Sequence, residues 1–292
     1  MTTLRHLKIF VTVAESGTMR KAAEILYISQ PSVSQAIQEL EHYYDIKLFD
    51  RLSRRIYITE AGKRLLSYAR QMIHLSQTME EAMRQTASGP ILRIGGSVTV
   101  GTVYLEQLVS QLENQIPGID IRVTVDNTST IENLILTSEL DFAIVEGLIT
   151  NEELLQQTVC EDELMLVVGP SHPFYATSSL SLEELQGQSL ISREKGSVER
   201  NQFEQLIAEK NIHMVKKWCC TNTETIKQAA IAGKGIAILS QKLIANELAN
   251  DTLRVLPIQG ATMKREFKLI LHKNKVLSPE VITFLKSVTL LH

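Results

Sequence analysis

The stretch AAEILYISQPSVSQAIQELE, residues 22–41, decides how the front of the chain folds. Two helical segments flank a break at residues 27–29, and Pro31 stands at the start of the second segment. A proline is tolerated there because first-turn N–H groups have no helical partner. We expect Ala23 to face the point where the two helices cross, since a larger side chain would push them apart. The stretch therefore predicts a helix-turn-helix.

The outward face of the second helix is polar. In a helix-turn-helix this face lies in the DNA major groove, with its first residues nearest the base edges. Glutamine can pair bidentately with adenine, and serine tolerates several bases. Taken alone, such a face is also typical of an amphipathic helix that is merely solvated. The residues on it are Gln30, Ser32, Ser34, Gln35 and Gln38.

A basic hairpin is predicted directly after these helices. The run LFDRLSRRIYIT, residues 48–59, consists of two short alternating segments around a tip that contains Arg51, Arg54 and Arg55. Arginines on such a wing bind phosphates or enter a narrow minor groove. A polar recognition helix followed by a basic wing favours DNA binding over simple solvation.

Together these residues resemble the LysR-type transcriptional regulators. The chain departs from the family pattern at Asp45, where glycine is usual, and we expect a slightly different turn because aspartate tolerates the left-handed conformation. The positions that match are Ala22, Ala23, Ser29, Gln30, Pro31, Val33, Ser34, Ile37, Leu40, Glu41, Leu48, Phe49, Arg51, Arg54, Thr59, Ala61 and Gly62.

The resemblance assigns DNA contacts to two elements. It places Gln30, Pro31 and Ser34 in the groove, and Arg51 and Arg54 on the wing. Position on the helices adds three further candidates, which are Thr18, Ser32 and Gln35.

A long helix is expected from Glu60 to about Thr86, and its apolar positions repeat at spacings typical of a coiled coil. Packing against the protein's own body is the alternative. We expect a homodimer through this helix, and the resemblance implies a homotetramer built from two dimers. The seam that would form the dimer contact is Leu65, Tyr68, Met72, Leu75 and Met79.

The remainder of the chain alternates strands with helices, which indicates α/β architecture with largely parallel sheets. The segments RIGGS, ELDFAIVEG, SREKGS and NTETIKQAAIAGKGIAIL resemble the LysR effector domain, and ELDFAIVEG is especially similar to members that govern sulfur assimilation and carbon fixation. The resemblance implies an all-α winged helix-turn-helix with a linker helix, followed by a two-lobed α/β domain like periplasmic binding proteins. The predicted divisions are 1–58 for DNA binding, 59–88 for the linker and dimerisation helix, and 89–292 for effector binding, with lobe I at about 91–160 and 266–292 and lobe II at about 161–265.

Polar residues at several strand-to-helix turns suggest a ligand cleft between these lobes. Free N–H groups and the positive end of a helix favour an anion. Each such residue could equally cap its own helix. The candidates are Ser97, Thr99, Asn127, Thr128, Ser197 and Thr223.

Few aromatic residues lie near this cleft, so a small polar metabolite, a carboxylate or an inorganic anion fits it better than a large aromatic ligand. Arg193 and Arg200 could neutralise an acid, although Glu194 and Glu199 could instead pair with them at the surface.

Catalysis, cofactors and metals find little support. There is neither a G-x-S-x-G nor an H-E-x-x-H motif, and the three cysteines are too few for a disulfide framework or a zinc site. The vicinal pair Cys219 and Cys220 is interpreted as packing of a strand end, with a redox or metal sensor as the alternative. No signal peptide or membrane span is evident, which indicates a cytoplasmic protein.

Charge is distributed unevenly along the chain. Residues 1–88 carry 12 Lys and Arg against 9 Asp and Glu, whereas the whole chain has a net charge of −3. The basic front raises nucleic acid as a partner, although a solvated helix face can produce the same charge. The resemblance, together with the recognition helix, the wing and the polar turns, implies a transcriptional activator that binds double-stranded DNA at an inverted-repeat operator, responds to a small anionic effector and has RNA polymerase as a further partner. An effector-independent or architectural DNA-binding protein is the alternative.

Overall fold

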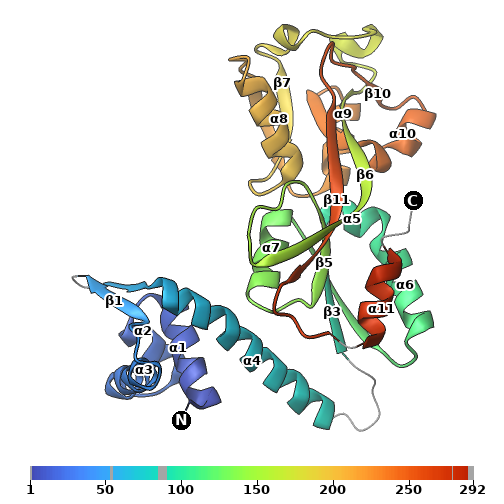
Figure 1. Cartoon of the computed structure of the whole chain (residues 1–292). Helices are drawn as coiled ribbons and strands as arrows, with labels where there is room; N and C mark the ends of the chain where they lie inside the picture. The colour runs from blue at the N-terminus through green and yellow to red at the C-terminus, as the bar shows by residue number, and fades with distance from the viewer. Residues whose placement is uncertain (1, 53–54, 85–90, 278, 289–292) are drawn as a thin grey trace.

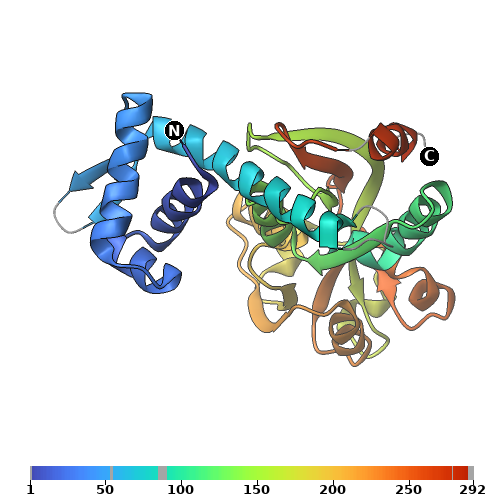
Figure 2. The same cartoon turned by 90° about the horizontal axis from the view of Figure 1, so that it is seen from below.

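The structure is a computed structural model that describes residues 2–52, 55–84, 91–277 and 279–288. Figure 1 shows a small helical domain at the N-terminal end, the long helix α4, and a body of two α/β lobes. Figure 2, seen from below, shows α4 running from the helical domain alongside the body. Within the described residues, every helix is too short or too polar to traverse a lipid bilayer.

Three helices and a hairpin make up the first domain. They are α1 (Leu4–Ser16), α2 (Met19–Leu26), α3 (Gln30–Tyr44), β1 (Phe49–Leu52) and β2 (Arg55–Ile58). Thr18 caps α2 by accepting the Lys21 N–H, and Ser29 caps α3 by accepting the Ser32 N–H. The Thr18 cap sets the start of α2, and the Ser29 cap sets the start of α3 at the end of the predicted turn.

The crossing of α2 and α3 is tightly packed. Ala22 and Ala23 are both buried, and the Ile28 N–H donates to the Ala23 carbonyl at 3.1 Å. The expectation that Ala23 faces the interior is confirmed. Asp45 ends α3 in the left-handed conformation with φ 52°, as expected for the residue that replaces glycine there.

The helix α4 (Glu60–Arg84) begins against the hairpin. A Cβ placed on Gly62 would lie 2.3 Å from the Leu48 carbonyl oxygen, so only glycine permits this approach. Leu65 is half-buried and packs on the core of the first domain. The side chains of Tyr68, Met72, Leu75 and Met79 are each more than half exposed. The seam thus presents apolar surface, and its role in dimerisation stays a prediction.

One sheet of nine strands runs through both lobes, in the order β4-β3-β5-β11-β6-β9-β7-β8, with β10 paired to β6. Lobe I contains the parallel strands β3 (Ile91–Ser97), β4 (Asp120–Asp126) and β5 (Phe142–Glu146). Lobe II contains the parallel strands β7 (Ser189–Arg193), β8 (Val215–Cys220) and β9 (Ile236–Ser240).

The two longest strands, β6 (Leu154–Val168) and β11 (Met263–His272), run between the lobes and pair antiparallel with each other. The expectation of a largely parallel sheet therefore holds within each lobe but fails at this junction. The strands predicted at 164–169 and 266–272 are parts of these longer ones, because the chain must span both lobes twice. The short β10 is Arg254–Val255.

Helices cover the sheet in both lobes (Figure 1). Buried leucine, isoleucine and phenylalanine side chains fill the space beneath them, among them Leu112, Phe142 and Phe267 in lobe I and Phe203 and Ile236 in lobe II. The helices are α5 (Val98–Val103), α6 (Leu105–Gln115), α7 (Thr128–Leu136), α8 (Val198–Ala208), α9 (Thr223–Ile231), α10 (Ala245–Ala249) and α11 (Pro279–Val288).

Helix α4 is hydrogen-bonded to lobe I. The buried His272 at the end of β11 lies 2.6 Å from Gln71 Nε2 and 3.1 Å from Ser67 Oγ. Farther along the helix, His74 Nε2 lies 3.7 Å from Asp141 Oδ1, and Lys275 Nζ lies 2.6 Å from the same oxygen. Burial opposes ionisation of Asp141, but the His74 hydrogen bond and the Lys275 charge lower its pKa to about 2. Polar contacts therefore join the linker to the lobe that contains both ends of the body.

Cys219 is exposed and Cys220 is buried, because successive strand residues point to opposite faces of the sheet. The expectation that both pack at a buried strand end thus holds for Cys220 alone. All three cysteines are free thiols.

Candidate functional site

The groove-facing candidates lie along the first two turns of α3. Gln30, Pro31 and Gln35 are exposed, whereas Ser32 and Ser34 are partly buried. The Ser32 hydroxyl lies 2.8 Å from the hydroxyl of the capping Ser29. The Gln35 amide donates to Glu39 at 2.8 Å. The helix N-terminus therefore presents polar groups outward, as a recognition helix does.

The wing follows α3, and its first strand begins at Phe49. Its strands pair antiparallel, with Arg51 opposite Ile56. Arg54 lies outside the described residues. Thr18, the remaining candidate, is half-buried and accepts the Lys21 N–H as the α2 cap.

Glu41 joins the recognition helix to the wing, and sequence reasoning did not assign it a role. Its carboxylate accepts the Leu48 N–H at 2.9 Å and the Phe49 N–H at 3.3 Å, and it pairs with Lys47 Nζ at 2.9 Å. Burial opposes ionisation, but these hydrogen bonds and the Lys47 charge lower the Glu41 pKa. The Leu-Glu match to the family pattern was the signal that pointed to it.

Four of the six effector candidates meet between the lobes, and all four are buried: Ser97, Thr99, Thr128 and Ser197. Their hydroxyl groups already have partners within the chain. The Ser97 hydroxyl donates to the Glu146 carboxylate, and Thr128 donates to the Glu146 main-chain oxygen at 3.4 Å. Ser97, Thr99 and Thr128 lie at the starts of the lobe I helices α5 and α7, as the sequence indicated.

The other two candidates lie apart from this cluster. Asn127 caps α7 by accepting the Thr130 N–H. A Cβ on Gly196 of lobe II would lie 2.9 Å from Asn127 Oδ1, so this residue marks the edge of the lobe contact. Thr223 begins α9, and its buried hydroxyl has no hydrogen-bond partner among the residues described. The expectation that four turns converge is therefore met by three of them.

A buried arginine, which the sequence did not single out, organises the junction. Arg265 of β11 donates from Nε to Asp162 of β6 at 2.7 Å and from Nη2 to the Thr99 hydroxyl at 3.1 Å. Its Nη1 lies 3.2 Å from Glu199 Oε1 and 3.6 Å from Glu146 Oε1. One guanidinium therefore contacts lobe I, lobe II and the paired strands between them.

The second arginine of the cluster is Arg193. Pairing with Glu194 or Glu199 at the surface was the alternative to neutralising a bound acid, but Arg193 and Glu199 are both buried. Arg193 pairs with Glu194 at 2.9 Å and lies 3.7 Å from Glu199 Oε1. Arg200 pairs instead with Glu204, at 2.8 Å.

The pKa values of the two glutamates that share Arg265 are shifted in opposite directions. Burial raises the pKa of Glu146 to about 8, and the neighbouring Glu199 charge adds to the shift. Burial also opposes ionisation of Glu199, but Arg265 and Arg193 outweigh it and lower the pKa of Glu199 to about 2. The cluster is thus closest to charge balance when Glu146 is protonated and Glu199 is ionised.

Glu146 makes stability depend on pH. Its pKa rises from 4.5 to about 8 on folding, so the folded state holds a proton that the unfolded state releases. Stability should fall with rising pH between those values, by roughly 1.4 kcal/mol per unit for this group. Urea denaturation of Glu146→Gln should show a flatter pH dependence over this range than that of the unaltered chain. Parallel profiles for the two proteins would assign the dependence to other groups.

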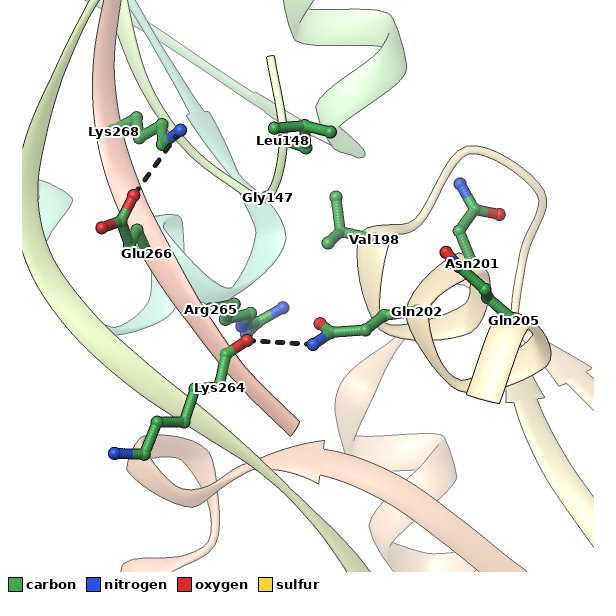
Figure 3. Close-up of a pocket in the computed structure, with 10 residues that line it drawn as sticks. All are labelled: Gly147, Leu148, Val198, Asn201, Gln202, Gln205, Lys264, Arg265, Glu266 and Lys268. Carbon is green, nitrogen blue, oxygen red and sulfur yellow. Dashed lines mark hydrogen bonds and ion pairs between the residues drawn. The ribbon is translucent and has the colours of Figure 1, made fainter. Parts of the chain in front are cut away.

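A pocket of about 470 Å³ opens beside the cluster, between β11 and α8 (Figure 3). Arg265 and Lys268 contribute positive charge, and Asn201 and Gln202 contribute amides. Glu266 contributes a carboxylate, which lies 3.5 Å from Lys268 Nζ. The Gln202 amide donates to the Lys264 carbonyl at 2.9 Å, which joins α8 to the strand. Cationic and amide groups around one pocket fit a small acid.

Residues 4–63 match the family model described as a bacterial regulatory helix-turn-helix protein of the lysR family. Residues 85–289 match the model of the LysR substrate-binding domain. The chain belongs to the LysR family. It is therefore a DNA-binding transcriptional regulator with an effector-binding domain, and its relatives are named regulators and not enzymes.

Curated relatives align with this LysR protein over nearly their whole length. A probable RuBisCO transcriptional regulator from Nostoc sp. is 32% identical over 290 residues, covering 97% of this chain and 86% of that protein. The HTH-type transcriptional activator CmpR from Synechocystis sp. is 30% identical over 285 residues, covering 97% of this chain and 93% of that protein.

Solved structures share the fold of this LysR protein. The regulatory domain of Synechocystis CcmR, in complex with 2-PG, gives a TM-score of 0.63 at 26% identity over 68% of this chain and 96% of that chain. A full-length OxyR variant from Pseudomonas aeruginosa gives 0.63 at 21% identity, covering 99% of this chain and 95% of that chain. The OxyR match covers nearly the whole chain, so it supports the order of helical domain, linker helix and two lobes along the sequence.

Proposed function

We propose that this LysR protein activates transcription from an inverted-repeat operator in response to a small anion bound between its lobes. The pocket beside Arg265 is the observation that carries the proposal. It lies where β11 and α8 meet Gly147 and Leu148, the two residues that follow β5, so an occupant touches both lobes. A ligand shifts a conformational equilibrium only through such differential contact.

The relatives support the chemistry of the effector. CmpR is named an activator, and the CcmR regulatory domain was solved with 2-PG. A small acid of this kind would find the Arg265 guanidinium, the Lys268 ammonium and the Gln202 amide at one site. We place the protein in the cytoplasm, with RNA polymerase as a further partner.

Assembly is the second part of the proposal. The exposed apolar residues of α4 support a homodimer, because a soluble helix rarely leaves such a seam uncovered. A homotetramer would follow from pairing two dimers. Two-fold pairing also matches an inverted repeat, whose half-sites lie about one helical turn apart.

The test uses DNA from upstream of the gene and of its neighbours. Fluorescence anisotropy of full-length protein should show tight binding to one fragment, with a change in affinity or bending when 2-PG, phosphate or small carboxylates are added. Equal affinity for all fragments and no response to any anion would favour an architectural DNA-binding protein.

Gln30→Ala tests the recognition helix. The exposed amide of Gln30 lies at the first position of α3, so its loss should reduce discrimination between operator and scrambled DNA by about 1–3 kcal/mol. Gln115→Ala, at the exposed end of α6, is the matched control and should change nothing. Unchanged discrimination in Gln30→Ala would remove this residue from the DNA contacts.

A further inference from the structure

The position where an anion was expected between the lobes is filled by a side chain of the protein. Glu199 is the second residue of α8 in lobe II, and it is buried. Its Oε1 accepts the hydroxyl of Thr99, from lobe I, at 3.1 Å. Its Oε2 accepts the hydroxyl of Ser197 at 2.9 Å. The carboxylate thus binds two of the residues predicted to hold the effector.

Two guanidinium groups complete the surroundings of this carboxylate. Arg265 Nη1 and Arg193 Nη1 lie 3.2 and 3.7 Å from Glu199 Oε1. Hydroxyl donors and guanidinium groups are the usual partners of a bound carboxylate. The arrangement has the composition of an anion site whose occupant is covalently part of the chain.

The pocket beside the cluster shares a wall with this site. Arg265 lines the pocket and also pairs with Glu199. Its Nη1 has no hydrogen-bond partner of good geometry among the described residues, although it lies within ion-pair distance of Glu146 and Glu199. An acid that enters the pocket therefore meets a guanidinium that Glu199 already neutralises.

The charge balance of the buried cluster determines whether a further anion can bind. With Glu146 protonated, the buried carboxylates of Asp162 and Glu199 balance the guanidinium groups of Arg193 and Arg265, so another anion would add excess negative charge unless one carboxylate moved away. Glu199 is the one whose contacts cross from lobe II to lobe I. Its departure would release the hydroxyl of Thr99 and one side of Arg265 together.

We propose that the Glu199 carboxylate is an internal ligand of the anion site between the lobes, and that a small carboxylate effector acts by displacing it. The inference rests on the proposed function in one respect, because it takes the Arg265 pocket as the entry for the effector. Before the effector binds, the contacts of Glu199 hold the two lobes together. The effector breaks these contacts and takes the place of the Glu199 carboxylate.

Acetate rescue of the full-length Glu199→Ala variant tests the proposal. Removing the carboxylate should lower the melting temperature, and acetate should restore it by about 2–4 °C more than chloride at equal ionic strength. Acetate has the carboxylate and methyl of the deleted group. The wild-type chain should need roughly tenfold more acetate for the same rise in melting temperature, because acetate must first displace Glu199 from the anion site.

Two variants serve as controls. Glu199→Gln fills the same volume without the charge. Its melting temperature should therefore be below that of the wild type, and acetate should not restore it. Glu204→Ala removes a glutamate of α8 that pairs with Arg200 and Lys216 away from the junction, and acetate should not affect it. The proposal would be overturned if acetate raised the melting temperature equally in all three variants. It would also be overturned if Glu199→Ala and the wild type responded at the same acetate concentration.

Folding failure also gives an answer. If Glu199→Ala is insoluble in chloride, its refolding yield is compared in acetate and chloride, and recovery in acetate alone supports the proposal. Failure in both salts, with Glu199→Gln folded, contradicts it. A wild-type DNA response to 2-PG combined with no acetate rescue would overturn the internal ligand and leave the proposed function intact. Acetate rescue of Glu199→Ala, combined with equal DNA affinity for all fragments and no response of the wild type to 2-PG, phosphate or small carboxylates, would overturn the proposed function alone.

Discussion

Replacing Arg265 with methionine should destabilise the two-lobed domain by about 3–5 kcal/mol, the range seen when one partner of a buried ion pair is removed. The guanidinium is the shared partner of Asp162, Glu199 and Glu146, and its side chain is 1% exposed. Methionine fills much of the volume but leaves the carboxylates uncompensated. Urea denaturation followed by the fluorescence of Trp218, the single tryptophan, measures the change.

The matched control is Arg122→Met. Arg122 also pairs with an aspartate, Asp120 at 3.0 Å, but the two side chains are 49% and 39% exposed. Its loss should change the free energy of unfolding by less than about 1 kcal/mol. If Arg265→Met behaved like this control, the buried cluster would contribute little beyond filling space.

Glu41→Ala should open the joint between the recognition helix and the wing. The Leu48 and Phe49 N–H groups would lose their shared buried acceptor, at about 2–4 kcal/mol in total. Amide hydrogen exchange of the full chain should therefore quicken at these two residues. DNA affinity should fall as well, because the wing would no longer be held relative to α3.

Two comparisons locate this effect. Glu41→Gln keeps an oxygen acceptor and should retain most of the protection. Glu39→Ala removes an exposed carboxylate on the same helix and should leave exchange at residues 48 and 49 unchanged. Normal protection in Glu41→Ala would show that the hairpin holds its place through Phe49 packing on Phe10, whose rings lie 5.3 Å apart.

The helix-turn-helix could be predicted because its determinants are local. Capping by Thr18 and Ser29 and the small side chains at Ala22 and Ala23 act within a few residues, and each leaves a recognisable pattern. The polar turns of the body were found for the same reason. Their residues precede helices whether or not a ligand is nearby.

The ion cluster could not be predicted, because its members are distant in the chain. Thr99 and Glu199 are 100 residues apart, and Arg265 is 166 residues from Thr99. In the sequence Arg265 is one charged residue within an alternating strand, and Glu199 looks like an ordinary acidic residue in a first helical turn. Only the folding of both lobes onto β6 and β11 reveals that these charges are buried together.

The position of β11 also constrains how the protein is made. This strand lies between β5 and β6, although it is the last strand among the described residues. On the ribosome, the first domain and α4 can fold while the sheet still lacks its middle strand, since domains form as they emerge. A product that stops before Met263 would keep the recognition helix and lose the frame that joins the lobes. Such a fragment would bind DNA but would not respond to a metabolite.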